Sequence, residues 1–147
     1  MQAKKILLTT DLSEESLRAF LPIAAFAGAQ GGSVTLLHIV EDVPIIAHGA
    51  PGSPPLHTPS LPDLIARAEE RIAEQAAELP KELLTDTAVF SAPHVAEAVA
   101  TYAKDNHFDL IALSSHGRSG FKRLFLGSVA EQLLRHATIP VLVFPRN

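Results

Sequence analysis

The chain has 147 residues, of which 47% are hydrophobic and 19% are charged, and its formal net charge is −4. This composition fits one globular domain and excludes a disordered tail, and the acidic balance argues against a dedicated nucleic-acid binder, which would carry a basic stripe. The chain has no cysteine, which excludes disulfides and thiolate metal sites and is compatible with a reducing cytoplasm.

The apolar run at the start of the chain stops at Leu8, after two lysines. Such a run is too short for a signal-peptide core or a membrane span. We therefore expect a cytoplasmic protein with neither a membrane nor a nucleic acid as a partner.

The first forty residues predict a strand, a helix and a second strand. Residues 6–8 are an apolar run without alternation, which is typical of a strand covered on both faces. Ser13 is a suitable N-cap for the helix that follows, and Gly31 and Gly32 end it. Residues 33–40 predict the second strand. The inward stripe expected for this helix is Leu17, Phe20, Leu21 and Ala24.

Residues 41–60 hold five of the eleven prolines and predict a long irregular segment. Residues 62–79 then predict an amphipathic helix with charges on its outer face. Its expected apolar stripe is Leu64, Ile65, Ala68, Ile72 and Ala76.

The remaining elements are a strand at 85–90, a helix with Pro93 in its first turn, a strand at 109–113, a helix at 127–136 and a strand at 141–144. The inward stripes expected for the two helices are Val95, Ala98, Val99, Tyr102 and Ala103, and Val129, Ala130, Leu133 and Leu134.

Strands that alternate with helices predict a parallel sheet between helical layers, in one domain spanning residues 1–147. Ligands of such sheets bind beyond the carboxyl ends of the strands, where successive crossovers leave toward opposite faces. In this chain the candidate strand ends are residues 9–11, 39–41 and 113–117.

The segment 113–130 leaves a strand, turns through glycines and small polar residues, and enters a helix at Gly127. It also carries Arg118, Lys122 and Arg123. Exposed backbone N–H groups and a helix N-terminus suit a polyphosphate. The three cations form either phosphate contacts or a solvated face. A P-loop and a GxGxxG turn are both missing from the sequence.

At these residues the chain resembles the universal stress protein family. Its ATP-binding members carry Gly, two residues, Gly, nine residues, Gly and then Ser or Thr. Gly117, Gly127 and Ser128 match the later positions of this motif, and Ser114 stands in place of the first glycine. The resemblance extends over most of the chain, through KKILLTTDLSEES, SVTLLHIVE, FDLIALSSHGRSG and IPVLVFPRN.

The resemblance implies a Rossmann-like α/β fold of the adenine nucleotide alpha hydrolase-like kind. We expect a single-domain open five-stranded parallel sheet with helices on both faces and strand order 3-2-1-4-5. It also implies a homodimer formed through the strand at 141–144. The implied ligand is ATP, or AMP or ADP, with Mg or Mn bridging the phosphates and no metal site made by the protein itself.

By the same resemblance, Asp11 and the backbone around Ile39 meet the adenosine, and Leu113 lines the base or sugar. The phosphates meet the backbone of the two matching glycines and the hydroxyl of Ser128. The complete expected set of nucleotide-binding residues is Thr9, Thr10, Asp11, Ile39, Leu113, Ser114, His116, Gly117, Arg118, Gly127, Ser128, Val129 and Ala130.

Some of these site residues also have a purely structural interpretation. Asp11 can be a turn residue, and the Gly127 and Ser128 pair can be an ordinary helix cap. Ser115 and Ser119 have no identifiable base and orienting acid, so we assign no catalytic residue. The family resemblance implies a dimeric nucleotide-binding module in stress physiology. The alternatives are a slow ATPase or phosphotransferase that uses the same pocket, and a nucleotide-free interaction scaffold.

Overall fold

The computed structural model describes residues 2–43, 51–52, 58–115 and 126–145. The strands are β1 (Lys5–Thr9), β2 (Ser33–Glu41), β3 (Leu84–Ala92), β4 (Leu110–Ser114) and β5 (Val141–Phe144). The helices are a 3-10 helix η1 (Glu15–Ala19) and the α-helices α1 (Phe20–Gln30), α2 (Leu61–Ala76), α3 (Val95–Asp105) and α4 (Ser128–His136).

Within these residues the five strands form one parallel sheet in the order β3-β2-β1-β4-β5. The expected fold and strand order are therefore confirmed. The strand β1 lies at the centre, with Ile6, Leu7 and Leu8 fully buried. Its short apolar run without alternation is explained by helices on both faces of the sheet.

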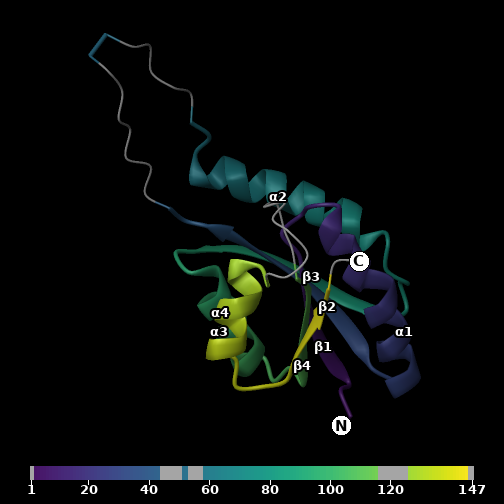
Figure 1. Cartoon of the computed structure of the whole chain (residues 1–147). Helices are drawn as coiled ribbons and strands as arrows, with labels where there is room; N and C mark the ends of the chain where they lie inside the picture. Colours follow the sequence, from purple (N-terminus) through teal and green to yellow (C-terminus); the bar gives the residue numbers. More distant parts are fainter. Residues whose placement is uncertain (1, 44–50, 53–57, 116–125, 146–147) are drawn as a thin grey trace.

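The helices divide between the two faces of the sheet (Figure 1). Helices α1 and α2 pack on the face that carries Ile6 and Leu8, and α3 and α4 pack on the face that carries Leu7. The connections from β1 to β3 thus use one face, and those from β3 to β5 use the other. The crossovers diverge between β1 and β4, which is where ligands of open α/β sheets bind.

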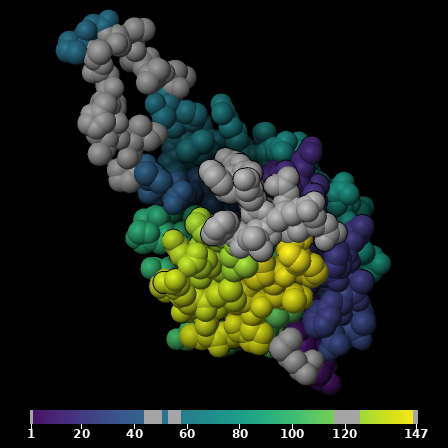
Figure 2. All heavy atoms as spheres, in the orientation of Figure 1, coloured from purple at the N-terminus to yellow at the C-terminus, as the bar shows by residue number. Residues whose placement is uncertain are grey.

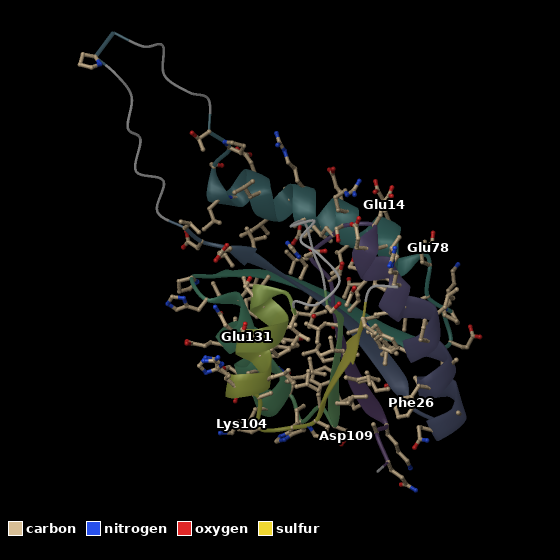
Figure 3. The ribbon with its side chains drawn as sticks, in the orientation of Figure 1. Glu14, Phe26, Glu78, Lys104, Asp109 and Glu131 are labelled. Carbon is tan, nitrogen blue, oxygen red and sulfur yellow. The ribbon has the colours of Figure 1, made fainter. Side chains whose placement is uncertain are left out.

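At the amino-terminal end of the sheet, a carboxylate connects the start of β1 to the start of β4. Asp109, just before β4, accepts hydrogen bonds from the backbone N–H groups of Lys4 and Lys5 at 2.9 and 2.8 Å. Glu14 lies in the turn that follows the carboxyl end of β1, and Asp109 lies toward the opposite end of the sheet (Figure 3). The contact therefore secures the end of β1 that lies away from the predicted ligand.

The first helical segment begins later than the sequence predicted. The 3-10 helix η1 begins at Glu15, and α1 begins only at Phe20. Ser13 therefore lies in the turn before η1, where its hydroxyl accepts from the N–H of Ser16 at 3.3 Å. Leu21, expected to face inward, is 69% exposed. The change from 3-10 to α geometry explains this error, because it rotates later residues away from a uniform helical stripe.

Helix α2 begins with a capping box. The Ser60 hydroxyl accepts from the Asp63 N–H at 3.3 Å, and the Ser60 N–H donates to the Asp63 carboxylate at 3.2 Å. The hydrogen bond from the Ser60 hydroxyl is the main cause of a lowered pKa at Asp63. Ala68 and Ile72 are buried as expected, and Gln75 is buried beside them.

The expected inward stripe of α3 is confirmed, because all five of its residues are buried or pack against the core, whereas α4 buries a narrower face than the sequence predicted. Pro93 precedes the N-cap residue His94 and lies outside the first turn of α3. In α4, Val129 and Leu134 are exposed. Helix α4 packs on α3 and β5, and these two neighbours cover only part of its surface. No helix in the described part of the chain is both long and apolar enough to cross a membrane.

Candidate functional site

A cavity of about 800 Å³ opens at the carboxyl ends of β1, β2 and β4. Its other walls are one face of α2 and the first turns of α3 and α4. It therefore lies where the crossovers diverge, and its volume falls in the range typical of small-molecule sites.

The cavity brings together residues that the sequence analysis selected from distant segments. Those among its lining residues are Thr9, Thr10, Asp11, Ile39, Leu113, Ser114, Gly127, Ser128, Val129 and Ala130. The other three predicted residues, His116, Gly117 and Arg118, lie outside the described residues, as do Lys122 and Arg123.

Asp11 follows β1 and lies in a turn that its own side chain shapes. Its Oδ1 accepts from the backbone N–H of Ser13 at 3.0 Å and also contacts the Ser13 hydroxyl. The turn interpretation therefore accounts for one carboxylate oxygen. Within the described parts of the chain, Oδ2 has no hydrogen-bond partner. Asp11 can thus shape the turn and still accept a hydrogen bond from a ligand.

The turn after β1 is also joined to β2. The carbonyl of Thr10 accepts from Nδ1 of His38 at 2.8 Å. Because a carbonyl oxygen can only accept, Nδ1 must carry the proton. His38 lies within β2, as the sequence predicted, and it lines the cavity beside Ile39.

Ser114 is the last residue of β4 and pairs with Phe144 of β5. Among the described non-glycine residues, only Leu12 and His107 have positive φ. Ser114 therefore does not need backbone angles that favour glycine. The next residue, Ser115, donates its N–H to the Phe144 carbonyl at 2.8 Å, so strand pairing continues to this point.

The N-terminus of α4 forms another wall of the cavity. Gly127 is its N-cap, with φ −58° and ψ 152°, and it supplies no capping side chain. The first N–H groups of an α-helix have no intrahelical acceptor, and they coincide with the positive end of the helix dipole. Gly127 is itself fixed because its N–H donates to the Ser115 carbonyl at 2.7 Å. This end of the cavity is suited to an anion.

The sequence analysis did not identify the wall formed by α2. Arg67 and Arg71 line the cavity together with Leu64 and Ala68. Arg71 donates to the Leu12 carbonyl at 3.3 Å and lies 3.6 Å from the Glu74 carboxylate. The i, i+4 spacing of the two arginines beside the apolar stripe was visible in the sequence. Only the folded topology shows that this edge of α2 faces the ends of β1 and β2.

The described residues contain no group of three His, Asp or Glu side chains that could hold a metal ion. His94 is the N-cap residue of α3 and His136 is the last residue of α4, and neither lines the cavity; His136 is 3.9 Å from Glu97. The described lining residues offer hydrogen bonding, apolar contact and cationic or dipolar attraction to a ligand.

Residues 2–145 match the model of the universal stress protein family. The chain is 30% identical to universal stress protein MJ0577 of Methanocaldococcus jannaschii, over 98% of this chain and 96% of that protein. The solved structure of MJ0577 superposes with a TM-score of 0.72 at 26% identity, and the alignment covers 100% of this chain and 99% of that one.

Two other solved structures share the fold and were determined as nucleotide complexes. One is a universal stress protein in complex with cAMP, with a TM-score of 0.63, 21% identity and coverage of 99% and 98%. The other is the universal stress protein from Archaeoglobus fulgidus in complex with dAMP, with a TM-score of 0.66, 16% identity and coverage of 97% and 98%.

Proposed function

Because the chain belongs to the universal stress protein family, we propose that its cavity binds an adenine nucleotide, either ATP or its relatives AMP and ADP. We further propose that the protein acts as a binding module in stress physiology, in the cytoplasm. The cAMP and dAMP complexes of proteins with this fold support an adenine nucleotide as the ligand class.

The observation that carries this proposal is that one cavity combines apolar surface, a carboxylate and N–H donors. Ile39 and Leu113 line the cavity, are almost fully buried and offer apolar surface to a base, and Asp11 lines the same cavity. The N-terminus of α4, where Gly127 supplies no capping side chain, offers N–H donors to phosphate. An adenine nucleotide carries a group to match each of these features.

Mg or Mn fits this arrangement only as a companion of the nucleotide. Magnesium is usually held by substrate phosphates and one or two carboxylates, and it retains several waters. When bound, the ion would neutralise phosphate charge. Ser128, at the first position of α4, offers a hydroxyl at the helix N-terminus that lines the cavity.

Mass spectrometry of nucleotide released from freshly purified protein, followed by calorimetry with ATP, AMP and magnesium, tests the proposal. We expect an adenine nucleotide in the released fraction, or binding at micromolar or lower dissociation constant. Protein that carries no adenine nucleotide and binds none in the titration would favour the scaffold alternative. Release of phosphate from ATP above a no-protein control would favour the ATPase alternative.

We also propose that the protein is a homodimer that pairs through β5. This strand ends the sheet, and Leu142 on it is 36% exposed. Residues of α4 and β5 lie together on one face of the molecule (Figure 2). An edge strand with exposed apolar side chains requires cover, and a second copy of the same strand supplies it.

A further inference from the structure

Three buried polar side chains form hydrogen bonds at the turn that carries Asp11, two of them from the turn itself and one from α2. Thr10, Ser16 and Gln75 are 6%, 3% and 7% exposed, and they are three of the five buried polar residues in the described ranges. Thr10 and Ser16 line the cavity, whereas Gln75 does not. Gln75 reaches the turn from α2, across about sixty residues of sequence.

The side-chain amide of Gln75 uses both of its functional groups on the turn. Its Oε1 accepts from the Thr10 hydroxyl at 2.6 Å. Its Nε2 donates to the Ser13 carbonyl at 3.1 Å and lies 3.5 Å from the Ser16 hydroxyl. An apolar residue of the same length could fill this space but could make none of these bonds.

These bonds fix a backbone conformation that is unfavourable by itself. The Thr10 hydroxyl also accepts from the N–H of Leu12 at 2.9 Å. Leu12 has φ 66°, in the left-handed region that a bulky residue rarely adopts. Such a conformation persists only where its surroundings over-determine it. Arg71, also on α2, supplies a second contact through the Leu12 carbonyl at 3.3 Å.

Position 75 lies on the buried face of α2, one turn from Ile72, where an apolar residue would normally pack. A buried amide is unfavourable unless all its polar atoms are bonded, and here they are. Packing alone therefore does not explain a glutamine at this position.

We infer that Gln75 is a positioning residue for the nucleotide, which holds the 10–16 turn and its Asp11 carboxylate in the binding conformation without touching the ligand. The inference rests on the proposed function. It makes α2 part of the recognition apparatus and couples the docking of this helix to the occupancy of the site.

Two variants on the same face of α2 test this. Gln75→Met keeps length and helix propensity but removes the amide, and Ile72→Val loosens packing on the same face without changing any hydrogen bond. Without nucleotide, amide hydrogen exchange at Leu12 and Ser13 should accelerate at least about tenfold in Gln75→Met and less than about threefold in Ile72→Val. With nucleotide, the affinity for AMP or ATP should fall at least about tenfold in Gln75→Met only.

Unchanged exchange in Gln75→Met would overturn the inference, and so would faster exchange with unchanged affinity. Wild-type protein that binds no adenine nucleotide would overturn the proposed function and, with it, the nucleotide part of the inference. If Gln75→Met does not fold, Gln75→Leu removes the same amide with a different apolar side chain and leaves the Thr10 hydroxyl in place as the acceptor for the Leu12 N–H. It should produce the same acceleration of exchange at Leu12.

Discussion

Gly127 caps α4 with backbone angles that any residue can adopt, φ −58° and ψ 152°. The backbone angles therefore do not require glycine at this position, which lies at the N-terminus of the helix. Gly127→Glu should abolish nucleotide binding, because a carboxylate would compete with phosphate for the same N–H groups and dipole. Calorimetry with ATP measures the loss, and thermal unfolding checks that the fold is intact.

The matched control at this position is Gly127→Ala, which adds a side chain without charge. We expect this variant to bind within about tenfold of the wild type. If Gly127→Glu and the wild type have equal affinities, the N-terminus of α4 does not contact the ligand.

Ser114 tests whether the first glycine of the family motif is necessary. Its position inside β4, paired with Phe144, gives it no need for glycine-specific angles. Its hydroxyl can also donate to a phosphate or ribose oxygen. Ser114→Gly should therefore change ATP affinity by less than about tenfold, or ~1.4 kcal/mol, in calorimetric titrations.

The opposite result at Ser114 would be informative. A wild type that binds no adenine nucleotide, together with a Ser114→Gly variant that does, would mean that the serine side chain obstructs the pocket. The scaffold alternative would then describe the natural protein.

At the scale of elements, two glycines near the end of α1 should respond in opposite ways to replacement by alanine. A Cβ on Gly28, inside α1, would lie 3.9 Å from Leu83 Cδ1, which is ordinary contact. A Cβ on Gly32, just before β2, would lie 2.6 Å from the carbonyl oxygen of Lys4. Gly28→Ala should raise the free energy of unfolding by about 0.5–1 kcal/mol through better helix propensity. Gly32→Ala should lower it by about 1–3 kcal/mol, because β1 and β2 must shift.

Urea denaturation measures both changes from the transition midpoints. Equal stabilities for the two variants would contradict the close approach of β1 to the start of β2.

The strand boundaries were predictable from sequence to within a few residues. An apolar run without alternation, such as Ile6–Leu8, indicates a strand whose two faces are both covered by helices. Helix faces were less predictable. Leu21 is exposed because the 3-10 turn before α1 rotates it away from the expected stripe, and Leu134 is exposed because α3 and β5 cover only part of α4. Gln75 was missed for the opposite reason, since its burial depends on hydrogen bonds to a turn far away in sequence.

At the scale of the whole molecule, the proposed dimer depends on the free edge of β5. A charge there should separate the subunits without disturbing the core, because Leu142 is partly exposed. Leu142→Glu should give folded monomer by light scattering at micromolar concentration. Leu21→Glu, on the exposed side of α1, is the control and should remain dimeric.

Truncation after Thr138 removes the whole of β5 and should leave monomer or aggregate. Intact protein that is monomeric at this concentration would overturn the proposed dimer.

The cavity was located from the sequence for a topological reason. Parallel strands bring their carboxyl ends to one edge of the sheet, so residues following β1, β2 and β4 must gather there. The α2 wall was not located, because alternating βα units do not specify how far a helix extends over that edge. That Arg67 and Arg71 line the cavity is evident only from the packing of α2.

The central position of β1 also affects the biosynthesis of the protein. One edge of β1 pairs with β2, which follows soon after it, but the other pairs with β4, and Asp109 lies 105 residues beyond Lys4. At typical translation speeds the ribosome adds those residues in roughly 5–20 s. During that interval the central strand of the sheet, with its buried apolar run, has one unpaired edge. Protection by a ribosome-associated chaperone would therefore be needed mainly between the synthesis of β2 and that of β4.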